Sequence, residues 1–317
     1  MEKFTEAVRE RDERMTDTGK TNRAKKDARK DNIQLFEGRS LTLGKTLVMG
    51  ILNITNDSFY ASSRVSGKRD ALARAVSMAE AGADIIDIGA ESTRPGSRRK
   101  KKEAETDALI PVIRSIRREL PNMPISADTR RASVAGEAIE VGADIINDVS
   151  GLELPDEAEA MITLAANTGA AYVLMHTRGT PDVMQDAPEY EDMMAELLDF
   201  FSKKIAVLTS GGVAKERVII DPGIGFGKRV SDNLTILANI EKFTEFGLPV
   251  MIGASRKLFI GSVAGGAARN DPAERLEGTL AVTSLLSFAG IDIVRVHDVA
   301  ANKRAVDMIA EITRHRL

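Results

Sequence analysis

A short apolar run recurs eight times along this chain, and its spacing is the feature that most limits the possible folds. Each run is rich in β-branched residues and nearly continuous, as in parallel strands that are buried on both faces. Longer amphipathic segments with helical patterns separate the runs. The runs are LVMGILNI (47–54), DIIDIGA (84–90), PISADT (124–129), DIINDVS (144–150), AYVLMH (171–176), VIIDPG (218–223), PVMIGAS (249–255) and DIVRVHD (292–298).

The junction that precedes a strand also repeats. In each copy a helix ends on glycine, a residue suited to the C′ position, and a strand begins a few residues later. Eight strand–helix units with one repeated junction predict an α/β protein with a (β/α)8 TIM barrel as its single domain, over residues 36–317. A doubly wound sheet is the alternative, although eight units in one chain favour closure. The copies are EAGADIIDIG (80–89), EVGADIINDV (140–149), TGAAYVLMH (168–176) and FAGIDIVRVHD (288–298).

The first 32 residues differ from the rest of the chain. They carry charges of both signs at high density and few apolar side chains, so they cannot bury enough surface to join a core. We expect a charged, flexible extension over residues 1–35. A helix packed on the domain or on a partner is the alternative.

The composition restricts the class of partner. The chain has 44 basic and 47 acidic residues and a net charge of −3, which argues against nucleic acid as the main partner. It has no cysteine, which excludes disulfides, thiolate metal sites and cysteine nucleophiles. No apolar run approaches the length of a membrane span, and the charged N-terminus does not resemble a signal peptide. We therefore expect a cytoplasmic protein without a membrane partner.

The catalytic groups of a barrel enzyme lie at the C-terminal ends of its strands. A polar residue at the start of a loop is common. Some of the polar residues at these strand ends, however, directly follow apolar residues, at a depth where an unpaired polar group costs free energy. Asp128, Asn147, Asp221 and Arg295 have this position. In chain order, the eight predicted ends carry Asn53, Glu91 with Thr93, Asp128, Asn147, His176, Asp221, Ser255 to Lys257, and Arg295 with His297.

Buried carboxylates, an amide, a lysine and an arginine that converge on one mouth suit a flat, nitrogen-rich heterocycle. Arg295 and His297, at alternate positions of one strand, point the same way and are suited to an anion. The glycine-rich stretch IIDPGIGFGK (219–228) fits neither the P-loop nor the dinucleotide pattern. Its glycines instead allow the backbone to pass close under a ligand.

From residue 47 to the C-terminus, long motifs in a consistent order resemble the dihydropteroate synthases, a family of pterin-binding enzymes. The resemblance implies a transferase of folate biosynthesis that condenses 6-hydroxymethyl-7,8-dihydropterin diphosphate with p-aminobenzoate, forming 7,8-dihydropteroate and diphosphate. It also implies assistance by Mg2+ and a homodimer formed through late helices of the barrel. The motifs are MGILNITNDSF, DIIDIGAESTRPGS, ISADT, ADIINDVSG, YVLMHTRGTP, IIDPGIGFGK, ASRKLFIG, RLEGTLA and DIVRVHD.

The resemblance also implies roles for particular residues. The pterin pocket would consist of Asp128, Asn147, Met175, Asp221, Lys257 and Arg295. Asn53, Arg295 and His297 would hold the diphosphate, with Asn53 as the contact to the metal. The aminobenzoate side, where sulfonamides compete, would be formed by Phe59, Thr93, Arg94, Pro95, Phe226 and Ser255, together with Lys257. Asp57 and Phe59 belong to a first loop that would fold over the site, and the catalytic set would be Asn53, Asp57, Lys257, Arg295 and His297.

The chain departs from the family pattern on the aminobenzoate side. The first loop, TNDSFYASS (55–63), lacks the usual proline and glycine pair, and Ala90, Ala254 and Leu258 replace Gly, Thr and Ser. Two alternatives therefore stay open: a corrinoid-dependent methyltransferase that shares the pterin-binding barrel, and a catalytically silent pterin-binding protein.

Four other polar residues have structural interpretations. We expect His176 to be structural and Lys228 to be a solvent-exposed loop lysine. Asp148 and Asp298 are interpreted as helix N-caps or hydrogen-bonded loop residues.

Overall fold

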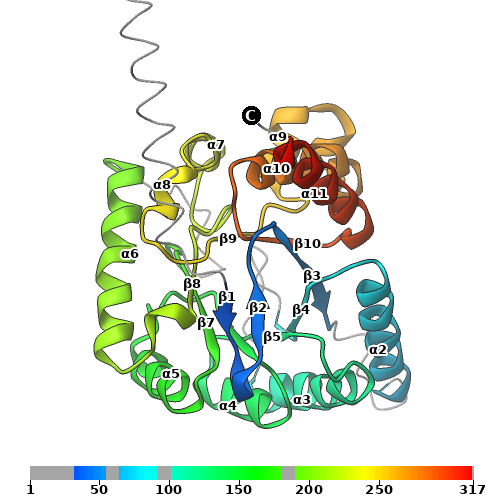
Figure 1. Cartoon of the computed structure of the whole chain (residues 1–317), viewed down its shortest axis with the longest axis vertical. Coiled ribbons are helices and arrows are strands. Elements are labelled where there is room, and N and C mark those ends of the chain that lie inside the picture. The colour runs from blue at the N-terminus through cyan, green and yellow to red at the C-terminus, as the bar shows by residue number, and fades with distance from the viewer. Residues whose placement is uncertain (1–31, 55–63, 92–100, 180–189, 316–317) are drawn as a thin grey trace, which may run out of the picture.

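The computed structural model describes residues 32–54, 64–91, 101–179 and 190–315. Eight parallel strands are hydrogen-bonded in the order β8-β7-β6-β5-β4-β3-β10-β9. A parallel bridge between Ile220 and Val250 joins β8 to the start of β9 and closes the ring. Helices surround the strands (Figure 1). The predicted (β/α)8 barrel is confirmed.

All eight predicted strands are present, and each is shorter than its apolar run. The barrel strands are β3 (Leu47–Asn53), β4 (Ile85–Gly89), β5 (Ile125–Asp128), β6 (Ile145–Asp148), β7 (Ala171–Met175), β8 (Val218–Asp221), β9 (Met251–Ile252) and β10 (Ile293–Val296). The α-helices are α2 (Arg64–Glu80), α3 (Lys102–Glu119), α4 (Ala132–Glu140), α5 (Pro155–Thr168), α6 (Met193–Ser210), α7 (Val230–Ala238), α8 (Glu241–Thr244), α9 (Leu258–Ala264), α10 (Leu276–Phe288) and α11 (Val299–Arg314). Short 3-10 helices are η1 (Phe36–Gly38), η3 (Lys215–Arg217), η4 (Gly266–Arg269) and η5 (Pro272–Arg275).

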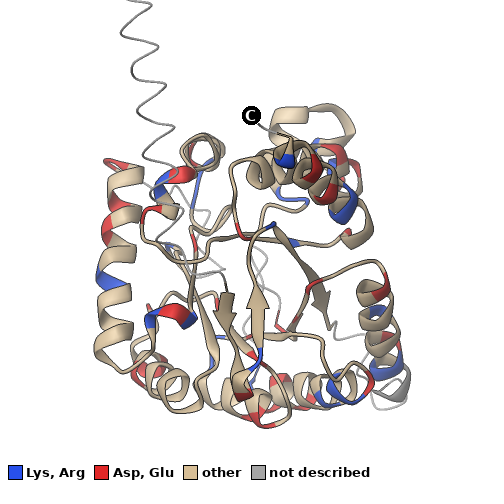
Figure 2. Cartoon of the chain, viewed as in Figure 1, with Lys and Arg blue, Asp and Glu red and all other residues tan. Residues whose placement is uncertain are grey.

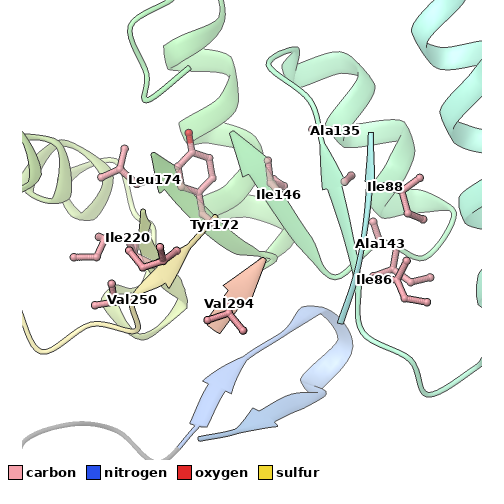
Figure 3. Packing of buried hydrophobic residues seen from close by; sticks show 14 of the residues in the cluster. Ile86, Ile88, Ala135, Ala143, Ile146, Tyr172, Leu174, Ile220, Val250 and Val294 are labelled. Carbon is pink, nitrogen blue, oxygen red and sulfur yellow. The ribbon is translucent and has the colours of Figure 1, made fainter. Parts of the chain in front are cut away.

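The strand side chains form two separate apolar layers because successive residues of a strand point to opposite faces. In β5 the odd-numbered Ile125 and Ala127 face outward, whereas in the other barrel strands the even-numbered residues face outward and pack under the helices, as Ile146, Tyr172 and Ile220 do in Figure 3. The remaining strand residues face the barrel interior. Their apolar members form an inner cluster of Leu47, Met49, Ile85, Ile145, Ala171, Val173, Ile219, Met251 and Ile293.

The repeated junction has a structural reason. In three of its copies, an aspartate just before one strand accepts a hydrogen bond from a backbone N–H at the start of the preceding strand. This contact links neighbouring strands at the N-terminal mouth of the barrel and occupies a donor that would otherwise be unpaired. The donor–acceptor pairs are Val48 and Asp84 at 2.8 Å, Ile125 and Asp144 at 2.8 Å, and Val250 and Asp292 at 2.7 Å.

A two-stranded antiparallel hairpin lies across the N-terminal mouth (Figure 1). Its strands are β1 (Asn32–Gln34) and β2 (Ser40–Thr42), which the apolar runs did not predict. Ile33, Leu35 and Leu41 are buried against the inner cluster. The last four residues of the predicted extension, 32–35, are therefore part of the packed fold, and residues 1–31 lie outside the described part of the chain.

Charged side chains lie mainly on the outer helices and loops, whereas the strands are largely uncharged in this view (Figure 2). Within the described ranges, none of the helices combines the length and the apolar character needed to cross a membrane.

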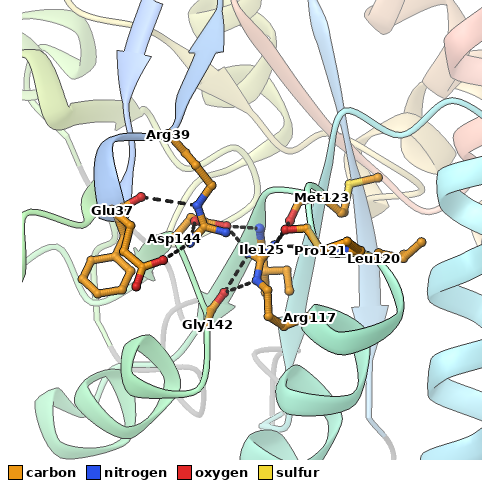
Figure 4. Close-up of polar contacts among 10 residues, drawn as sticks. Glu37, Arg39, Arg117, Leu120, Pro121, Met123, Ile125, Gly142 and Asp144 are labelled. Atoms are coloured by element: carbon orange, nitrogen blue, oxygen red, sulfur yellow. Dashed lines mark hydrogen bonds and ion pairs between the residues drawn. The ribbon is translucent and has the colours of Figure 1, made fainter.

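Asp144 is the buried centre of the ion network beneath the hairpin (Figure 4). Its carboxylate lies 2.8 Å from the Arg39 guanidinium and 2.6 Å from that of Arg117. Arg117 also donates to the backbone carbonyl of Gly142. Burial raises the pKa of Asp144, and the hydrogen bond from Ile125 and the two arginines oppose this shift. The network thus fastens the hairpin to β5 and β6.

We expect Asp144→Ala to lower the free energy of unfolding by about 2–3 kcal/mol. This is less than the loss from a fully buried pair, because both guanidiniums keep some contact with water. Urea unfolding measures the change. Asp199→Ala breaks an exposed pair with Lys203 and serves as the control, with an expected loss below about 1 kcal/mol. Equal losses in the two variants would contradict the assigned role of Asp144.

Candidate active site

A polar layer lies above the inner apolar cluster, toward the C-terminal mouth of the barrel. It contains Asp87, Asp128, Asn147, Asp221 and Arg295, one from each of β4, β5, β6, β8 and β10. All five occupy inward-facing positions of their strands, and four of them lie two residues after a member of the inner cluster. The acids and the amide are at most 7% exposed. Alternation along parallel strands therefore brings together residues that are far apart in the sequence.

Arg295 ties this layer together. Its Nε donates to Asp87 Oδ2 at 2.7 Å, and its Nη2 donates to Asp128 Oδ2 at 2.8 Å. Burial opposes the charge on Arg295, but the neighbouring Asp87 and Asp128 outweigh this effect and raise its pKa. Asp87 also accepts from Ser126 Oγ at 2.6 Å and from Asn147 Nδ2 at 3.2 Å. The guanidinium is thus held in one orientation.

Asn147 presents an unused acceptor. It is 1% exposed, and within the described part of the chain its Oδ1 has no hydrogen-bond partner. A buried carbonyl oxygen without a donor is costly, so this atom is suited to accept a hydrogen bond from a ligand or a water molecule. Beside it, burial raises the pKa of Asp128 to about 7, against the opposing charge of Arg295.

Asp221 and Met175 lie side by side, since they pair in register between β8 and β7. Burial raises the pKa of Asp221, with Lys257 as the first opposing charge. Asp221 Oδ1 accepts from the backbone N–H of Gly223 at 2.7 Å. An apolar Met175 side chain and a carboxylate at one wall suit the face and the edge of a heterocycle.

Lys257 and Phe226 contact each other at this mouth of the barrel. Lys257 Nζ lies 4.4 Å from the centre of the Phe226 ring and donates to the backbone carbonyl of Ile224. Loss of hydration lowers the pKa of Lys257 to about 7, although the Asp221 charge opposes the shift. Next along the chain, Ser255 Oγ accepts from the His297 backbone N–H at 3.2 Å and lies 3.1 Å from His297 Nδ1.

Asn53 is exposed at the C-terminal end of β3, in register with Gly89 of β4. In the described ranges no three His, Cys, Asp or Glu side chains are grouped as a metal site. The amide oxygen of Asn53 could serve as one ligand of a Mg2+ ion, which prefers oxygen donors.

The C-terminal mouth of the barrel brings together ten of the predicted site residues. These are Asn53, Asp128, Asn147, Met175, Asp221, Phe226, Ser255, Lys257 and the pair Arg295–His297 at the end of β10. Their roles toward ligands stay predictions. Five further predicted residues, Asp57, Phe59, Thr93, Arg94 and Pro95, lie outside the described residues.

The sequence did not identify Asp87 as a site residue, because a single carboxylate within the apolar run DIIDIGA was interpreted as part of a buried strand. The signal was its inward position, two residues after Ile85. The expectation for Lys228 was wrong: it is 2% exposed, and its Nζ lies 2.9 Å from His176 Nδ1. Burial lowers the pKa of Lys228 to about 7, with the Asp221 charge opposing the shift.

The other three residues with structural interpretations lie outside the polar layer. His176 packs edge-on against Phe200 of α6, and burial, followed by the Lys228 charge, lowers its pKa to about 2. Asp148 faces outward and accepts from Tyr172 Oη at 2.6 Å. Asp298 precedes α11 without capping it and forms an ion pair with Arg256 at 2.7 Å.

Comparison with known proteins identifies similar chains. The profile of the pterin binding enzyme family matches residues 49–297. The dihydropteroate synthase of Escherichia coli K12 is 42% identical over 278 residues, which cover 87% of this chain and 95% of that protein. The Yersinia pestis dihydropteroate synthase, solved with a sulfonamide drug, superposes with a TM-score of 0.81 at 36% identity, over 89% of this chain and 98% of that one. The Xanthomonas albilineans enzyme, solved with 4-aminobenzoic acid, gives 0.80 at 37% identity, over 90% and 100%.

The burial of Lys228 predicts a pH-dependent stability. Its native pKa of about 7 lies below the usual 10.5, so between these pH values the native state has released a proton that the unfolded chain keeps. The free energy of unfolding therefore rises with pH across this window. Because Lys228→Met removes the contribution, the stability of the wild type relative to this variant should grow from about pH 7 to about pH 10. Urea unfolding of both proteins across this range measures it, and parallel pH profiles would contradict the burial of an amine.

Proposed function

The chain belongs to the pterin-binding enzymes, among their dihydropteroate synthases, and from that premise we propose its substrates and the roles of its residues. It condenses 6-hydroxymethyl-7,8-dihydropterin diphosphate with p-aminobenzoate, forming 7,8-dihydropteroate and diphosphate in folate biosynthesis. The observation that carries the proposal is the buried polar layer with the open acceptor of Asn147.

We propose that the pterin lies flat over this layer. Asn147 Oδ1 and the carboxylates of Asp128 and Asp221 accept hydrogen bonds from its ring N–H and amino donors. Lys257 and Arg295 donate to its ring nitrogen and carbonyl acceptors. Because Asp128, Asn147, Asp221 and Arg295 lie on strands of the barrel, their side chains are oriented before the ligand arrives.

The diphosphate is expected at the outer end of β10, where Arg295 and His297 follow each other on the inward face. Arg295 Nη1 makes no hydrogen bond within the described part of the chain, so it remains able to donate to an anion. Asn53, exposed beside them, would contribute one oxygen to a Mg2+ ion whose other ligands are diphosphate oxygens and water. Bound there, the ion would offset charge on the leaving group.

The second substrate is proposed to enter on the side of Phe226, Ser255 and Lys257. Its amine forms a bond to the methylene carbon of the pterin as the bond from that carbon to the diphosphate oxygen breaks, and the amine then loses a proton. The electron-rich ring stabilises positive charge on the methylene carbon, so no covalent enzyme intermediate is required. A sulfonamide, which resembles the aminobenzoate, should compete on the same side.

A homodimer is also proposed. Large apolar side chains are exposed on α10 and α11, namely Leu285, Phe288, Met308 and Ile312, each at least 45% exposed. The two helices pack together, and an apolar patch of this kind is suited to a self-association surface. Sedimentation equilibrium should show a dimer that Met308→Glu weakens; a monomeric wild type would contradict the proposal.

The direct test of function is diphosphate release from dihydropterin diphosphate with Mg2+, with and without p-aminobenzoate, while dihydropteroate is followed in parallel. We expect both products to appear together and to depend on the aminobenzoate. Chelation of the metal should slow the reaction, and Asn53→Ala should raise the Mg2+ concentration that half-restores it.

Pterin binding without an aminobenzoate-dependent product would leave a silent binding protein and contradict the synthase. Methyl transfer to a corrinoid in place of condensation would instead favour the methyltransferase alternative. Lys204→Met, which alters a lysine outside the polar layer that contacts Leu152 and Glu153, should keep wild-type activity.

A further inference from the structure

The glycine-rich loop after β8, residues 223–228, is held from two opposite sides. Gly223, Gly225 and Gly227 all adopt positive φ, at 70°, 80° and 60°, which glycine tolerates best. The carbonyl of Ile224 accepts from Lys257 Nζ. The carbonyl of Phe226 accepts from Lys228 Nζ at 3.0 Å. Lys257 and Lys228 thus donate hydrogen bonds to two carbonyls of this loop, one before Phe226 in the chain and one at Phe226 itself.

The loop also contacts the segment that follows β7, with almost no space between the two. A Cβ at Gly223 would lie 1.9 Å from the His176 carbonyl oxygen, and a Cβ at Gly227 would lie 2.3 Å from that of Arg178. Tyr190 Oη donates to the Gly227 carbonyl at 2.8 Å. The position of the loop is therefore set by its contacts with residues 176–178 and with Tyr190.

Lys228 is the polar link between these two segments. All three partners of its Nζ are on them: His176 Nδ1 at 2.9 Å, the Phe226 carbonyl at 3.0 Å and the His176 carbonyl at 3.4 Å. In the described part of the chain it makes no ion pair with a carboxylate. Burying an amine costs free energy, so a buried lysine without a carboxylate partner in an ion pair needs another reason to be there.

We infer that Lys228 is a positioning residue for the aminobenzoate side of the active site, acting through the Phe226 carbonyl and His176. The inference rests on the proposed function, since it assigns Lys228 to that reaction. Lys228 fixes the Phe226 peptide, and Phe226 in turn keeps its ring against the Lys257 ammonium group at 4.4 Å. The pterin groups Asp128 and Asn147 lie on β5 and β6 and do not depend on this link.

Lys228→Met tests the inference, because methionine fills a similar volume without a donor. We expect the KM for p-aminobenzoate to rise about tenfold, the loss typical of removing hydrogen bonds from a buried carbonyl. The KM for dihydropterin diphosphate should change less than about threefold. A merely structural role would instead lower the amount of folded enzyme and move the two KM values alike.

Two further variants complete the experiment. Tyr190→Phe removes a single hydrogen bond to the same loop at Gly227 and should raise the aminobenzoate KM in the same direction by a smaller factor, even if Lys228→Met folds poorly. Lys204→Met is the matched control, since Lys204 also donates to a backbone carbonyl, at Leu152, but on a different loop. It should leave both KM values unchanged.

The outcomes distinguish a failure of the inference about Lys228 from a failure of the proposed function. If the wild type forms no dihydropteroate, the proposed function itself is contradicted. If the wild type is active and the folded variants at Lys228 and Tyr190 leave the aminobenzoate KM unchanged, or shift both KM values equally, the inference about Lys228 is overturned. A selective change in the aminobenzoate KM supports it.

Discussion

A partly buried arginine held by two buried carboxylates is the interaction on which the rest of the site depends. Arg295 enters the barrel on β10 and is fixed by Asp87 of β4 and Asp128 of β5. Each of these charges would be costly without the others, so the three strands must keep their register for any of them to be accommodated. This mutual requirement orients the polar layer and leaves one acceptor, Asn147 Oδ1, without a donor in the described part of the chain.

The fold could be predicted from the sequence because its signals are local. Nearly continuous apolar runs identified every barrel strand, and the repeated junction ends in an aspartate whose hydrogen bond to the preceding strand recurs at Asp84, Asp144 and Asp292. The hairpin of β1 and β2 was not predicted, since its strands have three residues each and adjoin a highly charged segment. Its burial depends on tertiary contacts of Ile33 and Leu35 with the inner cluster.

The site was predictable wherever a polar residue closed an apolar run. Asp128, Asn147, Asp221 and Arg295 met this condition, and the barrel brings them together. Asp87 did not, because it lies within a run and only the alternation of inward and outward positions identifies it. Lys228 was misjudged for a different reason: its burial results from the close approach of two loops, which depends on contacts between residues about 50 positions apart.

The stretch IIDPGIGFGK illustrates how one pattern serves several purposes. Asp221 belongs to the polar layer, the alternating glycines allow the loop to lie against the segment after β7, and Phe226 is presented to Lys257. Glycine is needed at these positions because a Cβ would clash with the backbone of the segment after β7 and with the aliphatic part of the Lys257 side chain. The two sides of the site are thus built differently: strands fix the proposed pterin side, and the loop after β8 contributes Phe226 to the proposed aminobenzoate side.

The central claim is that the polar layer recognises a pterin, and calorimetric titration with dihydropterin diphosphate and Mg2+ in the absence of aminobenzoate tests it most directly. The wild type and Asn239→Ala, which alters a surface amide at the end of α7, should bind alike. Asn147→Ala should bind about tenfold or more weakly, because a buried hydrogen bond to the ligand is lost. Equal affinity of all three proteins, or no binding by the wild type, would contradict the account.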